Sequence, residues 1–366
     1  MAYTNIDDPS AHFQTATYTG GGANTEVTNS GNSDLKPDFL WIKNRTAAYG
    51  HFVVDSNRNI SYAQNSSNAP YLETESTAAE NNNQNWMASV NTNGFTTGIS
   101  EHINNNSGSA FVAWQWKCQG GTTSNLSGNL ASVVQVNADA GFSIVTYTGS
   151  GGNGQSVLHG LGLTPEVIIT KARNGADNWH VYHKSIGNTK ILKLNTTDAE
   201  ASSSAYSAAA VSSSAFFVST SLIYVGQLGA DFVSYCFAPI QGYSKFGSYV
   251  GNGNANGAFV YLGFAPAWLL IKRFDAGATN WNLYDNKRES SGGGFAAGQD
   301  ASRRLFPNSS AAESADAAHS NLDFTSNGFK LRGTQGSQNG SGSSYIYMAF
   351  AENPFTTSTG VPTTAR

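Results

Sequence analysis

Charged residues are scarce in this sequence. Asp, Glu, Lys and Arg make up 12% of its 366 residues, about half of the ~25% that is usual in globular proteins. The formal net charge is -4, so no basic surface indicates a nucleic-acid partner. No apolar run approaches the ~18 residues of a membrane-spanning helix, so we expect no membrane insertion. The opening MAYTNIDDPS holds no basic and no apolar stretch, and we expect no secretory signal.

Cysteine is nearly absent. The two cysteines, Cys118 and Cys236, cannot form a disulfide framework. They also fall at different points of the repeat described below, so neither has a counterpart in another copy. We interpret both as free thiols.

Glycine and aromatic residues are plentiful instead, with 39 glycines and 12% aromatics. Disorder is a weak interpretation, because aromatic and β-branched residues recur at regular spacing along the whole chain. This mixture is typical of many short strands joined by tight turns, and it suits helices badly. The sequence therefore predicts an all-β fold.

Three stretches share one design, running from a proline to a lysine six positions later: Pro37–Lys43, Pro165–Lys171 and Pro266–Lys272. An apolar run that follows a proline and ends at a polar loop is typical of a strand buried on both faces. Proline is tolerated at a strand start, where no ladder bond is lost. Three copies of a central strand imply three copies of the unit built around it.

Other landmarks recur around these strands. A half-buried strand precedes each one, beginning near Phe13, Phe142 and Phe246, and an aromatic strand follows it. A Leu–Glu pair, eight positions apart, comes next, and an aromatic strand closes each copy. Recurrence of independent landmarks at near-fixed offsets predicts tandem repeats with a period of about 100 residues. With several short strands per copy, we expect three tandem repeats, each a small antiparallel β-sandwich or jelly-roll-like domain.

The expected boundaries follow from these landmarks. We expect repeats over residues 1–117, 141–240 and 241–355, a linker with one short strand over 118–140, and a flexible tail over 356–366. The short connection between the last two repeats predicts that they are rigidly coupled. The longer linker predicts more freedom for the first repeat.

The candidate motifs for chemistry are weak. Gly149, Gly151 and Gly154 form a G-x-G-x-x-G string, but no helical period follows, so we interpret it as a turn. His180 and His183 lie on opposite faces of a strand because their spacing is odd, and they cannot chelate a metal together. The aromatic strands end in Asp55, His183 and Asp285, and a shared metal ligand would not vary in this way.

The recurrent charges also favour a structural interpretation. Lysines 43, 171 and 272 and the glutamates Glu80, Glu200 and Glu313 either pair within each repeat or form a solvated edge. One recurrent glutamate per copy does not make the carboxylate pair of a glycosidase. We expect no catalytic residue, no cofactor and no metal.

The seven tryptophans include candidates for sugar-stacking platforms. Six of them sit in strand patterns and are expected in the core. Trp86 lies in the polar run AENNNQNWMAS, so it is the tryptophan most expected to be exposed and the one candidate for ligand contact.

The opening MAYTNIDDPSAHFQTATYTG and the motifs GFSIVTYTGSGGNG, NWHVYHKSIG, YCFAPIQGYSKFGSYVGNG and YIYMAFAENPF resemble a family of repeat proteins of marine tailed phages. Those are fibre-like or appendage components of the virion, grouped under a domain of unknown function. The resemblance covers about residues 1 to 355 and brings no catalytic residues. It implies a structural or host-recognition role on a virus particle that is assembled in the host cytoplasm and released by lysis.

Three functions stay open on these grounds. One is a tail-fibre or appendage protein, expected as a homotrimer, that contacts other virion proteins and a host-surface glycan or protein receptor. A second is a capsid decoration protein, and a third is a carbohydrate-binding or carbohydrate-active module. For recognition we expect loops to serve rather than strands, first the segments 56–85 and 288–308.

Overall fold

The computed structural model of the chain is all-β. It describes residues 3–58, 70–82, 86–100, 102–103, 107–118, 124–206, 211–219, 225–288, 303–314 and 322–363. Within these ranges the helices are short 3-10 turns, η1 (Pro9–Ala11), η2 (Ser56–Arg58) and η4 (Lys184–Ile186). None of the helices so described is long and apolar enough to cross a membrane. We call residues 1–117, 124–240 and 241–355 modules 1, 2 and 3.

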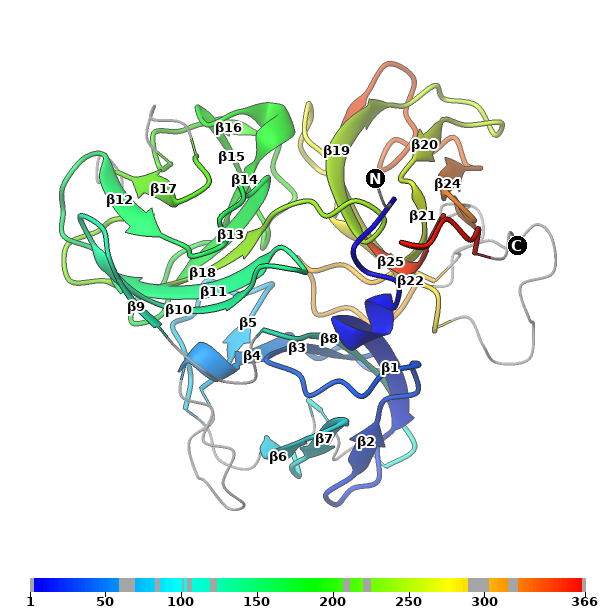
Figure 1. The fold of residues 1–366 in the computed structure, drawn as a ribbon, viewed down its shortest axis with the longest axis horizontal. Coiled ribbons are helices and arrows are strands. Elements are labelled where there is room, and N and C mark those ends of the chain that lie inside the picture. Colours follow the sequence, from blue (N-terminus) through cyan, green and yellow to red (C-terminus); the bar gives the residue numbers. More distant parts are fainter. Residues whose placement is uncertain are drawn as a thin grey trace.

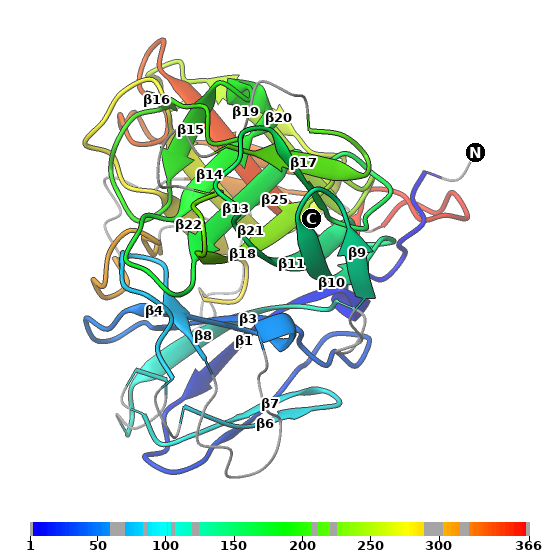
Figure 2. The same cartoon turned by 90° about the vertical axis from the view of Figure 1, so that its left-hand side faces the viewer.

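Module 1 is built on a five-stranded antiparallel sheet with the order β1-β8-β3-β4-β5. Its strands are β1 (Phe13–Thr19), β8 (Ala110–Trp116), β3 (Phe39–Asn44), β4 (His51–Asp55) and β5 (Leu72–Glu73). A second sheet has the order β2-β7-β6, with β2 (Glu26–Thr28), β7 (Gly94–Thr97) and β6 (Met87–Asn91). Figure 2 shows β6 and β7 as a separate layer beyond β1, β3 and β8.

Module 2 has an eight-stranded sheet with the order β16-β15-β14-β13-β18-β11-β10-β9. These strands are β9 (Ser124–Ser127), β10 (Ala131–Asn137), β11 (Phe142–Thr148), β13 (Val167–Ala172), β14 (His180–His183), β15 (Lys190–Lys193), β16 (Ala201–Ser202) and β18 (Asp231–Phe237). The strands β12 (Gln155–Leu158) and β17 (Ala215–Val218) pair to form its second layer.

Module 3 has a four-stranded sheet with the order β19-β25-β21-β22 and a three-stranded sheet with the order β20-β24-β23. The first holds β19 (Ser244–Val250), β25 (Ser344–Pro354), β21 (Phe264–Arg273) and β22 (Asn282–Asp285). The second holds β20 (Phe259–Tyr261), β24 (Gly328–Leu331) and β23 (Leu322–Thr325).

The larger sheets of all three modules share one strand order. In each, the first strand pairs with the closing strand, which pairs with the central strand, which pairs with the aromatic strand. The expected all-β fold and its antiparallel sandwich layers are confirmed, while the origin of the modules as tandem repeats stays a prediction.

The register corrects one landmark. Phe13 faces Trp116 and Phe142 faces Phe237, but Phe350 faces Ser244. Phe246 therefore takes the position of Thr15, not that of Phe13.

The central strands are buried on both faces, as predicted, because apolar side chains pack against both faces of each large sheet. In β3, Leu40 and Ile42 point to the sandwich core of module 1, whereas Phe39 and Trp41 point to a core shared by all three modules. Alternation along a strand sends neighbouring side chains to opposite faces, so two cores require a continuous apolar run. The six tryptophans expected in the core are all buried there: Trp41, Trp114, Trp116, Trp179, Trp268 and Trp281.

The expected linker is part of a sheet instead. Its described residues form β9 and β10, and β10 pairs with β11 along Ser132–Asn137. The alternating residues of this segment, with Val134 buried at 2% exposure, add two strands to the edge of module 2. Residues 119–123 lie outside the described residues.

The three modules form a closed ring in which each sends a loop over the next (Figure 1). The amide of Glu80 in module 1 donates to the carbonyl of Arg173 in module 2 over 2.7 Å. The amide of Glu200 in module 2 donates to the carbonyl of Phe274 in module 3 over 2.8 Å. The backbone amide of Glu313 in module 3 donates to the carbonyl of Arg45 in module 1 at 2.8 Å. The expected freedom of module 1 is wrong, because loops join it to both neighbours.

The three lysines of the central strands hold these loops. Each ammonium group donates a hydrogen bond of 3.1 Å to a backbone carbonyl of another module. Lys43 donates to Ser310, Lys171 to Thr77 and Lys272 to Thr197. Burial lowers the pKa of all three ammonium groups to about 8. Neither the expected pairing of lysine with glutamate inside a repeat nor a solvated edge occurs, because backbone carbonyls surround each ammonium group.

The recurrent glutamates bind arginines in two of the seams. Glu313 accepts from Arg45 at 2.7 Å, from Arg303 at 3.0 Å and from Arg288 at 3.3 Å. Burial raises the pKa of its carboxyl, but the hydrogen bonds and charges of these arginines outweigh burial and hold the pKa below its ordinary value. The carboxylate of Glu200, at the remaining seam, pairs with Lys190 at 3.4 Å.

The last residue of each aromatic strand reaches the closing strand of the next module. Asp55 accepts from the hydroxyl of Tyr235 at 2.6 Å, and Asp285 accepts from the indole of Trp114 at 2.9 Å. The Nε2 of His183 lies 3.2 Å from the carbonyl of Tyr347. The residue at this position therefore forms a buried hydrogen bond to the next module at each seam. Aspartate and histidine both make such a bond, which explains why the charge of this position varies.

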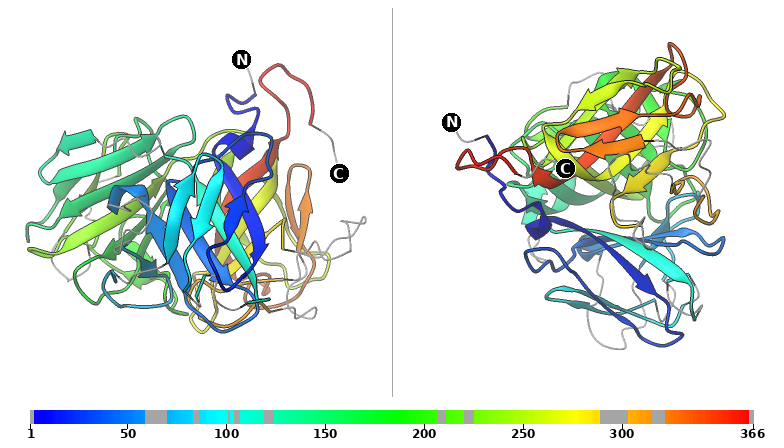
Figure 3. Two further views of the ribbon diagram at one scale, coloured as in Figure 1. Left: turned by 90° about the horizontal axis from the view of Figure 1, so that it is seen from below. Right: turned by 90° about the vertical axis from the view of Figure 1, so that its right-hand side faces the viewer.

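The segment after Phe355 is ordered through Thr363. The amide of Thr357 donates to the carbonyl of Val361, and that of Thr363 to the carbonyl of Phe355. Asp7 accepts from the amide of Ser358 at 2.6 Å, so the N-terminal segment and this loop lie side by side (Figure 3). A frayed tail over 356–363 is therefore wrong, and residues 364–366 lie outside the described residues.

The different surroundings of Glu313 and Glu200 predict different stability losses when each is changed to glutamine. Glu313 is 4% exposed and its carboxylate is shared by Arg45, Arg288 and Arg303, so Glu313→Gln removes the buried negative charge of this cluster and is expected to cost about 3 kcal/mol of unfolding free energy, although Asp285 still pairs with Arg288. Glu200→Gln removes one half-exposed pair and is expected to cost less than about 1 kcal/mol. Urea unfolding of both variants measures this difference, and equal losses would contradict the assigned seam contacts.

The histidine at the second seam predicts acid sensitivity. Burial lowers the pKa of His183 to about 4, against the opposing effect of the hydrogen bond to Tyr347. Since the unfolded chain takes up this proton near pH 6.5, stability is fully present above that pH and is lost as the pH falls from 6.5 through 4. His183→Gln keeps a donor for Tyr347 and is expected to flatten the pH dependence of unfolding in this window. An unchanged slope would contradict the burial of a neutral imidazole.

Candidate functional site

Trp86, the sequence-predicted ligand contact, is not exposed. Its side chain is 4% exposed and stacks on Phe52 with ring centroids 4.4 Å apart and on Tyr71 at 4.2 Å. The polar residues before Trp86 gave no sign of this core role, because its aromatic partners are distant in sequence: Phe52 lies on β4, and Tyr71 immediately precedes β5. Trp86 is a core residue of module 1 and cannot serve as a stacking platform in this state.

The glycine string forms a turn between β11 and β12, as predicted. Gly151 and Gly154 have φ values of 78° and 65°, which favour glycine, and no helix follows among the described residues. Both predicted free thiols, Cys118 and Cys236, are unpaired and buried.

The two histidines of β14 are buried and structural. The Nε2 of His180 lies 3.2 Å from Asp177 Oδ2, while His183 faces module 3. Among the described residues no group of three His, Cys, Asp or Glu side chains is placed to hold a metal ion.

The loops expected to serve recognition are only partly described. Residues 59–69, 83–85 and 289–302 lie outside the described residues. The described remainder is used inside the molecule: the Thr74 hydroxyl donates to the carbonyl of Pro307 at 2.7 Å, which ties the two segments to each other across the seam between modules 3 and 1.

Two carboxylates meet beside Gly50. Side chains of Glu73 and Glu75 both lie against the position that a Cβ on this glycine would occupy. Burial raises the pKa of Glu75 to about 7, against the hydrogen bond from the His51 amide, and burial also raises the pKa of Glu73. The pair is able to retain a proton near neutral pH, and the hydrogen bond from His51 gives Glu75 a structural task.

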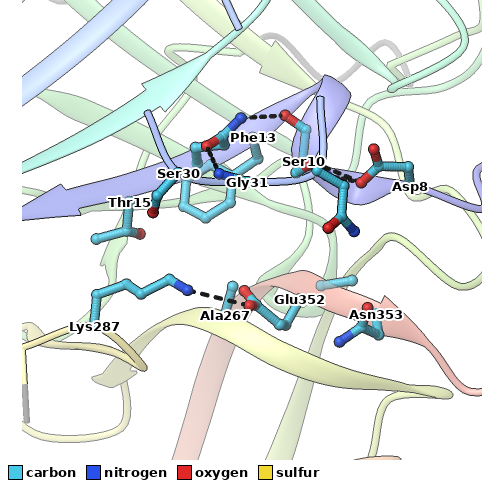
Figure 4. A pocket seen from close by; sticks show the side chains of 13 residues that line it. Asp8, Ser10, Phe13, Thr15, Ser30, Gly31, Ala267, Lys287, Glu352 and Asn353 are labelled. Carbon is cyan, nitrogen blue, oxygen red and sulfur yellow. Dashed lines mark hydrogen bonds and ion pairs between the residues drawn. The ribbon is translucent and has the colours of Figure 1, made fainter. Parts of the chain in front are cut away.

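The described surface also holds a polar cleft of about 110 Å³ at the seam between modules 3 and 1. Figure 4 shows its two walls. The lining residues are Asp8, Ser10, Phe13, Gln14, Thr15, Ser30, Gly31 and Asn32 from module 1, and Ala267, Lys287, Ala351, Glu352 and Asn353 from module 3. Its rim is open to solvent, because Gly31, Asn32 and Asn353 are exposed.

Hydrogen bonds fix the module 1 wall. Asp8 accepts from the hydroxyls of Ser10 and Ser33, both at 2.6 Å. The Gln14 amide donates to the carbonyl of Ser10 at 2.9 Å and accepts from the amide of Gly31 at 2.8 Å. These contacts tie the N-terminal segment to the loop after β2, so the wall is already ordered.

The module 3 wall carries one ion pair. Lys287 Nζ lies 3.3 Å from Glu352 Oε1, with side chains 41% and 37% exposed. Lys287 follows β22 and Glu352 lies near the end of β25, and their long side chains meet across β21, the strand between these two. Opposite charges leave this wall with little net charge while it offers both donors and acceptors.

Thr15 sets this seam apart from the other two. Its position on the first strand is held by Ile144 in module 2 and by Phe246 in module 3, as the partners on the closing strands show. Thr15 is 7% exposed, and its buried hydroxyl has no hydrogen-bond partner in the structure. The sequence analysis missed the difference at Thr15 because it treated Phe246 as the equivalent of Phe13 and not of Thr15.

Module 3 also breaks the pattern on its outer sheet. Phe259 and Tyr261 of β20 are 47% and 48% exposed, whereas the matching positions of β2 are Glu26 and Thr28. Tyr261 lies under the ammonium of Lys245, which is 5.3 Å from its ring centre. We call Phe259 and Tyr261 the aromatic strip.

Comparison with known proteins places the chain in a family. Neither the curated proteins nor the solved structures give a match. A family model described as a domain of unknown function, DUF7483, matches residues 8–354, which span all three modules. The chain therefore belongs to the DUF7483 family.

Proposed function

We propose that the protein is a non-enzymatic structural component of a tailed bacteriophage particle, most specifically a tail-fibre or appendage protein that contacts the host surface. The observation that carries the proposal is the aromatic strip, a pair of half-exposed rings on a strand whose counterpart in module 1 is polar. Exposed aromatic groups rimmed by polar residues are typical of interaction sites.

The closed ring supports a structural role. Each seam combines backbone hydrogen bonds with buried polar contacts, so the three modules present a fixed surface to a partner. Fixed surfaces bind with a smaller loss of conformational entropy, which suits a particle protein that meets its receptor outside the cell.

The assignment of the charged residues supports a non-enzymatic role. Glu80, Glu313, Asp55 and Asp285 are all engaged by arginines. A carboxylate held by a guanidinium stays ionised and is a poor general acid. Glu75, with its raised pKa, is the residue to examine if activity is found.

Particle localisation tests the proposal. Gold-labelled antibody against the protein is expected to mark the tail or its fibres on purified virions, because an attachment protein must reach the cell before the head does. Labelling spread over the head would favour a capsid decoration protein instead. Virions without the chain would contradict the proposal.

The purified protein gives the complementary test. It is expected to compete with virions for adsorption to host cells, and Phe259→Thr with Tyr261→Thr is expected to weaken this competition at least fivefold. Glu26→Ala with Thr28→Ala, the matched change on β2, is expected to leave it unchanged. Digestion of host polysaccharide by the protein, abolished by Glu75→Gln, would contradict the non-enzymatic role and favour the carbohydrate-active module.

A further inference from the structure

We propose that the polar cleft between modules 3 and 1 binds one uncharged sugar ring of a host-surface glycan. The evidence that a ligand belongs there comes from the cleft itself. The choice of a glycan as its source rests on the proposed role in host attachment.

The unpartnered hydroxyl of Thr15 points to a ligand. A buried hydroxyl without a partner costs about 1 to 3 kcal/mol, and such groups in folded proteins call for a bound water, ion or ligand. At the other two seams the same position holds Ile144 and Phe246, both buried in the apolar core that the modules share. An apolar side chain therefore fits this position of the fold, and a hydroxyl is not needed to build the seam.

At the seam between modules 1 and 2, protein side chains and an additional strand fill the space that corresponds to the cleft. Asn57 of module 1 stands at the position of Lys287, two residues after the end of the aromatic strand, and its side chain donates to the carbonyls of Val133 at 2.8 Å and Ile144 at 3.0 Å. Ser56 beside it bonds Gln135 of β10. The extra strand β10 thus covers that seam, while β1 of module 1 is an edge of its sheet and the equivalent space stays open.

The chemistry of the walls selects an uncharged polyol. Thr15 is able to donate and accept, Glu352 accepts, and Lys287 donates. The ion pair between Lys287 and Glu352 cancels the net charge of its wall, and the Asp8 carboxylate on the opposite wall is engaged by the hydroxyls of Ser10 and Ser33, so a free anion is disfavoured and the remaining donors and acceptors suit hydroxyl groups. A sugar hydroxyl both donates and accepts, so it matches the polar groups of both walls.

The cleft admits part of one ring and no more. A volume of about 110 Å³ equals the space of about four water molecules at ~30 Å³ each. One edge of a sugar ring enters this space while the rest of the glycan leaves through the exposed rim at Asn32 and Asn353. Water alone is the competing occupant, because the same groups would bind it.

Saturation-transfer NMR on the full chain tests the proposal with a panel of uncharged hexoses and N-acetylhexosamines and with soluble host-surface polysaccharide. At least one member is expected to bind, and Thr15→Val is expected to weaken that binding about fivefold or more. Thr17→Val is the matched control, because Thr17 lies on the same strand and is exposed. Valine has the shape of threonine, so Thr15→Val is expected to melt no lower than the wild type.

Two results would overturn the proposal. One is the absence of binding by every sugar and by the polysaccharide, which leaves a cleft that holds only water. The other is binding that Thr15→Val does not change, which places the sugar elsewhere. If the protein binds sugar but is missing from virions, the proposed function is contradicted and the assignment of the cleft is not.

Discussion

The contact on which the structure depends is the loop that each module lays over the next. The loop brings backbone carbonyls to the buried ammonium groups of Lys43, Lys171 and Lys272. A module alone would bury each lysine with fewer acceptors, and a buried cation without acceptors is costly. It would also expose the inner face of its large sheet. Three such head-to-tail contacts close into a ring, so no module is left with an open end.

The shared core follows from this closure. Phe39 and Trp41, Tyr235 and Phe237, and Trp268 and Phe350 come from different modules and pack into one cluster. Trp116 lies 5.7 Å from Trp268 and 5.5 Å from Phe350, measured between ring centres. Burial of such large rings is a major stabilising contribution, and it is available only when all three sheets are in place. The interior is therefore a product of the ring and not of any single sandwich.

The features that suggest function lie where the modules differ. Thr15 replaces an apolar residue at one seam, and Phe259 and Tyr261 replace polar residues on one outer sheet. The residues that recur in all three modules hold the ring together. Thr15 lowers stability, and the exposed Phe259 and Tyr261 lower solubility, without adding a contact between modules. That contrast is the reason for proposing binding at the cleft and at the aromatic strip.

Much of the fold could be predicted from the sequence because its signals are local. Alternation and the Pro-to-Lys runs located the central strands, and strand patterns placed six tryptophans in the core. Contacts between distant segments could not be predicted in this way. Trp86 sits in a polar run yet is buried by Phe52 and Tyr71. The one short strand predicted within residues 118–140 is present as β10, but its pairing with β11 and β9 could not be seen from the sequence. The cleft joins residues near Thr15 to residues near Lys287 and Glu352, and only the register of the strands reveals that Thr15 stands where Ile144 and Phe246 stand.

Differential scanning calorimetry of the full chain tests the interlocked ring most directly. If the three modules depend on each other for their common core and for their buried lysines, they unfold together. We then expect one transition whose calorimetric enthalpy equals its van't Hoff enthalpy. Two or more separate transitions would show modules that fold on their own and would contradict the ring as the unit of stability.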